Sequence, residues 1–457
     1  MSGPRSLHVA AAVLAVVLAL AVVLAPVAGL PSVGTPASPS SSPAASTPSA
    51  DPGTEREPRS PATVPSADLR DPVRPDRNTT AYLTLAADLE TRRTGTATFD
   101  VGGAMAADNS ATHSTYETTW LRAAFEAAGE NRTQRRLVVE RGADRIDTRI
   151  EALEDREARA LEQYNEGVIS TRTYLREVAT IDRAARSLRE SVDLLYTYSS
   201  AVGKPVTDRR IAAQKARLLP LVGPVRSRTA AAIRGDKPPT RVYVETSSQG
   251  VILATIDRGA FTQEYLREAY VPSARNPGGI DQFERSGDRL GAARQRAAEL
   301  YPWAFDRGPT SAGSFTGEPF LFNAGVYSVQ VGHPHGTSRT HDLLIFLDGA
   351  TRDVFHEIQY KDLSAVPTVS AATNASQGIN VSIDRTRTGG PMLVTVRNTT
   401  TGEPVQAQVL VDGDPVGVTD VDGQRWIIAP GPTVQVTAVS GERNVTTTVF
   451  SDGAPTG

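Results

Sequence analysis

Three histidines in the second half of the chain have the spacing that comes closest to a metal site. His333 and His335 are separated by a single proline, and His356 follows further along the chain. Two histidines one residue apart can share one face of a strand and bind a zinc ion through their imidazole nitrogens. The glycines and the proline around the first two instead favour a loop with incidental histidines. A metal-dependent hydrolase that uses these three residues is therefore kept as the second alternative function.

The other residue patterns that support catalysis are missing from the sequence. It contains no HExxH helix, no GxSxG elbow, and no P-loop or GxGxxG after a strand. The absence of cysteine excludes a thiol nucleophile, a thiolate metal site, a disulfide framework and a lipid-modified cysteine. Carboxylate pairs are frequent on the predicted helices, where we expect them to face solvent. We therefore predict a protein that is not an enzyme, with no catalytic, cofactor-binding or metal residues and no cofactor.

The charge balance bears on the kind of partner. The 48 basic and 51 acidic side chains nearly cancel and leave a formal net charge of -3. A chain without a basic excess has no electrostatic footprint for nucleic acid or for an anionic membrane surface. We therefore expect no nucleic-acid partner, and protein partners or the cell envelope instead.

An apolar run at residues 9–25, which follows Arg5 and ends before Pro26, predicts export. A bilayer span takes roughly 20 apolar residues, whereas the core of a signal peptide has about 7–15. Because this run lies between the two lengths, residues 1–30 are either a cleaved signal peptide or a retained transmembrane anchor. Both alternatives keep the basic N-terminus inside and place the rest of the chain outside the cell or on its surface.

A stalk and a set of sequons follow the leader. Residues 31–77 are rich in Pro, Ser and Thr, and we expect them to be disordered because they cannot bury enough apolar area to offset chain entropy. Residues 78–117 form a short irregular or strand-containing lead-in. From its start onward lie six Asn-x-Ser/Thr sequons, which are candidate glycosylation sites of an exported protein. Their asparagines are Asn78, Asn131, Asn374, Asn380, Asn398 and Asn444.

Residues 118–235 are rich in Ala, Arg, Glu and Leu and predict a long antiparallel helical hairpin of coiled-coil type. Apolar residues of the second arm alternate spacings of four and three, which is a heptad seam. The seam consists of Tyr174, Val178, Ile181, Ala185, Leu188, Val192 and Leu195. Ser170 is the expected N-cap of this arm. Pro220 and Pro224 should interrupt the helical segment that follows at 208–234.

Residues 240–365 predict a mixed α+β domain, because strands and helices come in separate runs. We expect strands at 241–244, 251–256, 325–331, 342–347 and 354–361, and helices at 262–269 and 288–300. The last two strands form the hairpin LLIFLDGATRDVFHEIQY. Its residues Leu347, Asp348, Gly349 and Thr351 resemble the terminal hairpin of PepSY-type secreted domains, whose final strand is an outer one. That resemblance implies a regulatory or protein-binding module.

Residues 369–452 contain only strand and turn patterns and predict a small Ig-like β-sandwich of seven strands. The strands are expected at 379–383, 392–397, 407–411, 417–419, 425–428, 434–438 and 445–450. Segments 401–405, 418–423 and 430–431 resemble, in this order, the carboxypeptidase-regulatory-like and Ig-like repeats of exported proteins. The resemblance implies a structural or adhesive module without catalysis. Asp420-x-Asp422-Gly423 lacks the later acidic ligand of a calcium loop and is interpreted as a tight turn.

The order of these regions and the segment GVISTRTYLREVATIDRAARSLRESVDLL resemble a family of exported cell-surface proteins of halophilic archaea, which brings no known activity. The expected fold class is a multidomain α+β protein with a long antiparallel helical hairpin, a mixed α+β domain and a C-terminal β-sandwich. The favoured function is that of a non-catalytic exported surface protein with a structural, adhesive or protein-interaction role. A PepSY-like regulator or inhibitor of an exported protease is the first alternative.

Overall fold

The computed structural model describes most of the chain after residue 81. The described residues are 82–85, 89–259, 263–305, 310–312, 321–332, 342–364, 366, 368–386, 390–428 and 433–450. The apolar run, the stalk, the sequon at Asn78 and the histidines His333 and His335 lie outside these residues.

A helical bundle occupies the first half of the described chain. Its helices are α1 (Val101–Ala127), α2 (Arg132–Asn165), α3 (Thr171–Ala201), α4 (Asp208–Leu218) and α5 (Pro224–Arg234), with a 3-10 turn at Leu219–Leu221. Asp100, Asn131, Ser170 and Thr207 cap the first four, because each side chain accepts a backbone N–H that helix geometry leaves unpaired. Pro224 is accepted at the first position of α5, which confirms the predicted interruption.

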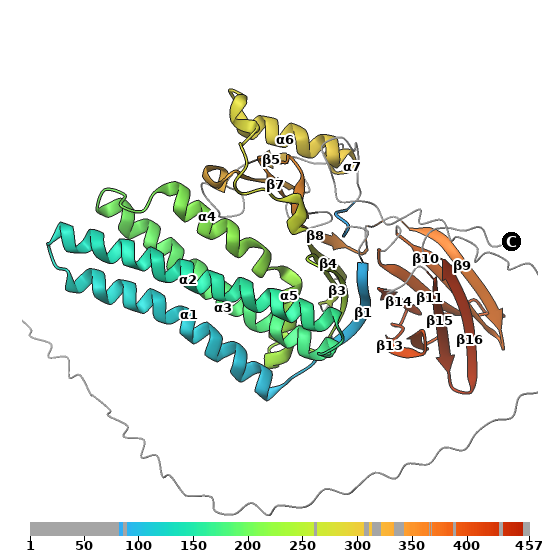
Figure 1. Ribbon diagram of the computed structural model, residues 1–457. Helices are drawn as coiled ribbons and strands as arrows, with labels where there is room; N and C mark the ends of the chain where they lie inside the picture. Colours follow the sequence, from blue (N-terminus) through green and yellow to red (C-terminus); the bar gives the residue numbers. More distant parts are fainter. Residues whose placement is uncertain are drawn as a thin grey trace, which may run out of the picture. The chain divides into compact units, whose positions relative to one another are not determined.

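The helix α3 lies at the centre of the bundle, with α1, α2 and α5 packed around it (Figure 1). The seam predicted on α3 is confirmed, because all seven of its residues are fully buried. The two-arm hairpin is incomplete, however, since residues 101–117 belong to α1 and are not an irregular lead-in. Within residues 101–117 the buried side of α1 consists of small residues such as Ala107, Ala111 and Ser114, whereas Leu121 and Phe125 are buried further along the helix. Small side chains let two helices approach closely but leave no large apolar seam to recognise in the sequence.

An eight-stranded antiparallel sheet packs against the bundle. Its strands, in spatial order, are β1 (Leu89–Ala97), β2 (Thr240–Ser247), β3 (Val251–Arg258), β4 (Gln263–Tyr270), β8 (Val354–Asp362), β7 (Asp342–Asp348), β6 (Val326–Val331) and β5 (Thr310–Ala312). One face packs against α2, α3 and α5. The other packs against α6 (Arg289–Leu300), α7 (Pro302–Phe305) and the segment 82–85. Three 3-10 turns lie at Pro272–Ala274, Phe283–Arg285 and Leu321–Ala324.

Three features of this sheet differ from the sequence prediction. The strand β1 precedes the helices and pairs with β2 after them, so the sheet extends beyond 240–365. The helix predicted at 262–269 is wrong, because this stretch forms β4 between β3 and β8. Its sequence QEYLREAY has a helix-like composition, and burial of both its faces hides the alternation of a half-exposed strand. The strand β8 pairs with both β7 and β4, so the expected outer strand is interior. The strands β2, β3, β6 and β7 and the helix α6 confirm their predictions, and the short strand β5 was not predicted.

The C-terminal region forms two four-stranded antiparallel sheets, which confirms the predicted sandwich. One sheet contains β14 (Gln424–Ile427), β11 (Met392–Asn398), β10 (Ile379–Arg385) and β9 (Val369–Ser376); the other contains β13 (Asp414–Val418), β12 (Gln408–Val411), β15 (Thr433–Ser440) and β16 (Arg443–Phe450). Alternate residues of these strands form one apolar core. The strand β9 is additional to the seven predicted, because it is polar and mostly exposed. Gly423 has a φ of 72°, and Asp420 accepts the Gln424 N–H at 2.8 Å, which confirms the tight turn.

Candidate functional site

A cluster of buried polar groups, here called the Glu357 cluster, lies where β4 and β8 pair. Glu357 has no exposed surface. Its Oε1 accepts hydrogen bonds from Arg267 Nη1 and Gln359 Nε2, each at 2.8 Å. Its Oε2 accepts the Tyr301 hydroxyl at 2.6 Å and the Leu83 backbone N–H at 2.8 Å. Arg267 also donates to the Leu83 carbonyl. Both oxygens are thus engaged, as a buried charge requires, and the cluster holds the segment 82–85 on the sheet.

A second cluster, the Glu268 cluster, lies on the face of β4 that meets the helices. Glu268 Oε1 is 3.1 Å from Nε of Arg226, and its Oε2 accepts the Val225 N–H at 3.1 Å. The guanidinium of Arg226 also donates twice to Glu157, at 2.7 and 3.1 Å. A side chain at Gly223 would force the Glu268 carboxylate out of its place, because an added Cβ would lie 1.8 Å from its Oε2. The N-terminus of α5 is therefore built around a buried carboxylate.

Asp182 on α3 completes the Glu268 cluster and is only 1% exposed. It accepts the Gly223 N–H at 3.2 Å and Nε of Arg186 at 2.9 Å. Burial raises the pKa of Glu268 to about 7; Arg226 opposes this shift, and the charge of Asp182 adds to it. Arg226 itself stays ionised through its two contacts with Glu157. Within this cluster, desolvation therefore acts on the carboxyl group of Glu268 and raises its pKa.

Perturbed carboxyl groups often mark catalytic sites, but ion-pair networks perturb them equally. In both clusters each charged group faces an opposite charge, a backbone N–H or a hydroxyl, and this arrangement joins the bundle, the sheet and the segment 82–85. The expectation that helix carboxylates face solvent is wrong for Asp182. A signal for these residues exists in the sequence only as adjacent charges, Arg267 and Glu268, within a tyrosine- and leucine-containing stretch. Without knowledge of the strand pairing, this pattern cannot be distinguished from the pattern of an exposed helix.

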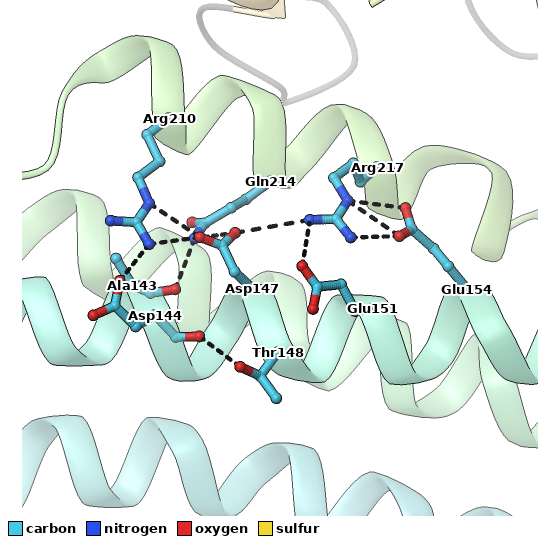
Figure 2. Close-up of polar contacts among 9 residues, drawn as sticks. All are labelled: Ala143, Asp144, Asp147, Thr148, Glu151, Glu154, Arg210, Gln214 and Arg217. Carbon is cyan, nitrogen blue, oxygen red and sulfur yellow. Dashed lines mark hydrogen bonds and ion pairs between the residues drawn. The ribbon is translucent and has the colours of Figure 1, made fainter.

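A third group of charges joins α2 to α4 at the surface (Figure 2). Arg210 contacts Asp144 and Asp147 with N–O distances of 2.7 and 2.6 Å. Arg217 contacts Glu154 at 2.5 Å. These side chains are partly exposed, Arg217 by 28% and Glu154 by 38%, so water screens the pairs and their net contribution is small. They orient α4 on α2 and form no site with a reactive group.

Of the three histidines predicted as a possible zinc site, the structure describes only His356. His356 is 2% exposed, stacks on Phe346 with 5.1 Å between ring centroids, and has Nδ1 2.9 Å from the Ala269 carbonyl. Burial lowers the pKa of His356 to about 4, so its imidazole is neutral near pH 7. The described residues contain no group of three or more His, Cys, Asp or Glu side chains arranged for a metal ion. Since His333 and His335 lie outside these residues, the zinc hypothesis stays a prediction.

The sequons differ in how their amide groups lie. Asn131 and Asn444 are exposed, and Asn398 is half-exposed at the end of β11. Asn380 is half-buried on β10, where its Oδ1 lies 3.1 Å from the hydroxyl of Thr373. Asn374 on β9 uses its Nδ2 to donate to the Thr446 carbonyl at 2.7 Å. No helix within the described ranges has the length and apolar character of a membrane span.

The fold and these clusters define a class: a multidomain α+β protein in which a helical bundle shares buried charges with an antiparallel sheet, followed by an Ig-like sandwich. Residues 370–447, which form the C-terminal sandwich, match an archaeal fibronectin-III type-like domain. Residues 11–238 match a domain of unknown function (DUF7096), and residues 242–367 match a family of unknown function (DUF7094). No curated protein and no solved structure matches the chain significantly.

The two regions of unknown function share strand pairs and buried charges in this chain. Leu83 and β1 belong to the first region, whereas their partners Glu357, Arg267 and β2 belong to the second. The Glu268 cluster likewise joins Arg226 of the first region to a strand of the second. The boundary between the two matches therefore runs through one sheet and one core.

Proposed function

We propose that this protein is an exported, non-catalytic protein of the archaeal cell surface that presents its folded regions for contacts with other proteins. The observation that carries the proposal is the archaeal fibronectin-III type-like sandwich at residues 370–447, on a chain with an apolar run at 9–25 and a Pro/Ser/Thr-rich segment after it. Sandwich domains of this architecture are common in cell-surface proteins. The resemblance of the α3 segment supports a halophilic source.

The buried clusters support a non-catalytic role. Glu357, Glu268 and Asp182 are buried acids of the bundle and sheet, and each is paired within the fold. A general acid or base needs a proton donor or acceptor that faces a substrate. A protein in which such groups join elements to one another is better suited to hold a rigid shape than to carry out a reaction.

Protease treatment of intact cells that make the protein tests the location. We expect added protease to remove the sandwich, detected with an antibody against residues 368–450, while a cytosolic enzyme in the same cells stays intact. A protein that is fully protected in intact cells and soluble in the cytosol after lysis would contradict export.

Crosslinking and purification from the cell envelope test the role. Envelope proteins that crosslink to the chain in stoichiometric amounts would support the interaction function. A protease that co-purifies and loses activity when the chain is added would favour the PepSY-like regulator instead. One zinc ion per chain, with hydrolytic activity lost on chelation, would favour the hydrolase.

A further inference from the structure

The turn between α1 and α2 displays one sequon at the end of the bundle remote from β1 (Figure 1). Because α1 has 27 residues, this turn lies about 40 Å along the helix from its start next to β1. The sequon is Asn131-Arg132-Thr133, and all three residues are exposed. The site is therefore accessible to a large enzyme without unfolding of the bundle.

The amide of Asn131 has its two ends in different environments. Its Oδ1 accepts the backbone N–H of Gln134 at 3.0 Å and caps α2. No atom of the described residues accepts a hydrogen bond from Nδ2 in this structure, so the nitrogen that would carry a sugar is free to react. Since the cap uses only the oxygen, attachment of a sugar to the nitrogen leaves the cap in place.

Two sequons of the sandwich contrast with this arrangement. The Nδ2 of Asn374 donates across the sandwich to the Thr446 carbonyl at 2.7 Å, so a sugar there would displace a contact between β9 and β16. Asn380 is half-buried on β10, between the paired strands β9 and β11. In the folded chain, neither amide nitrogen is presented as that of Asn131 is.

We propose that Asn131 carries an N-linked saccharide, and that Asn374 and Asn380 do not. The donor is a lipid-phosphate-linked oligosaccharide. Nδ2 forms a bond to the anomeric carbon of the sugar, the bond from that carbon to the phosphate oxygen breaks, and Nδ2 loses one proton. This modification rests on the proposed export, because the donor is used on the outer side of the membrane. A bulky, solubilising glycan at this turn would keep the bundle end out of close protein contacts.

Mass spectrometry of glycopeptides from the full-length native protein tests the proposal. We expect the peptide that contains Asn131 to carry a saccharide in most molecules, and the peptides that contain Asn374 and Asn380 to be unmodified. The variant Thr133→Ala should lose the saccharide completely because it destroys the sequon, whereas Thr133→Ser should retain it. Both leave the capping asparagine in place.

The variant Asn131→Asp separates the sugar from the cap. Aspartate caps helices as well as asparagine does, so this variant should lose the saccharide while its helical circular dichroism stays unchanged. If protease removes the protein from intact cells but the Asn131 peptide is unmodified, the inference is overturned and the proposed function is not. Saccharides at Asn374 or Asn380 would also overturn it. A protected cytosolic chain without sugars would overturn both.

Discussion

At the scale of single residues, burial shifts the pKa values of two groups near Arg226 in opposite directions. Burial raises the pKa of Glu268 to about 7 and lowers that of His356 to about 4, and the positive charge of Arg226 lowers both. Between pH 4.5 and 7 native Glu268 keeps a proton that the unfolded chain has lost, so its stabilisation disappears as pH rises through 7. Native His356 is neutral where the unfolded chain is protonated, so its stabilisation disappears as pH falls from 6.5 toward 4.

Single variants should therefore separate two opposing slopes in the free energy of unfolding. In Glu268→Gln the free energy of unfolding should fall more steeply than in the natural chain as pH decreases from 6.5 to 4.5. In His356→Phe it should fall as pH increases from 5 to 7. Each slope is limited to one proton, about 1.4 kcal/mol per pH unit. Urea unfolding followed by circular dichroism at several pH values measures both, and identical pH profiles for the two variants would contradict the assignment.

Removal of Glu357 tests the other cluster. Glu357→Ala leaves the buried charge of Arg267 without its opposite charge and the Leu83 N–H without its acceptor, so we expect a loss of about 3–5 kcal/mol in the free energy of unfolding. Glu154→Ala is the matched control, because Glu154 and its partner Arg217 are both partly exposed; its expected loss is below about 1 kcal/mol. Chemical denaturation measures both variants. Equal losses would show that the Glu357 cluster does not stabilise the contact between the segment 82–85 and the sheet.

At the scale of elements, the difference between α1 and α3 explains what could be predicted. The α3 helix buries large apolar residues at heptad spacing, a pattern that burial in almost any bundle produces. The part of α1 up to residue 117 buries glycine, alanine and serine, which are also common in loops. Its helical state depends on close packing in the bundle and on the cap at Asp100, and neither feature forms a long-range pattern in the sequence.

Two neighbouring alanines of α1 test this close packing. Ala107 is 1% exposed, whereas Ala106 faces solvent. Ala107→Leu should lower the free energy of unfolding by about 1–3 kcal/mol, because the larger side chain pushes the helices apart. Ala106→Leu should change it by no more than about 0.5 kcal/mol. Thermal or urea unfolding compares them, and a neutral Ala107→Leu would mean that α1 does not approach its neighbours closely.

At the scale of the whole molecule, we expect residues 82–367 to fold as one unit, because the two matched regions share one sheet and one core. The strand β1 and the segment 82–85 must return to partners that follow the bundle in sequence, and these contacts have a large sequence separation. The sandwich has its own apolar core of alternating strand residues. This difference predicts how fragments behave.

Fragments with chosen ends test the unit. Residues 242–367 alone should fail to give a cooperative unfolding transition, because they lack β1, the segment 82–85 and the helices that cover one sheet face. Residues 82–367 should unfold cooperatively, and residues 368–450 should do so alone. Circular dichroism and proton NMR dispersion report the outcome for each. A well-folded 242–367 fragment would contradict the shared core.

The sequence by itself determined the local features of this protein, because these depend on neighbouring residues. They include the cap at Ser170, the seam of α3, the breaks at the prolines and the sandwich with its glycine turn. Only the tertiary structure decided that QEYLREAY is a strand and that β8 is interior. It also decided that Glu357 and Glu268 connect the sheet to the segment 82–85 and to the helices. Their states depend on partners far away in the sequence, and a buried charge is stable only once those partners have been brought together.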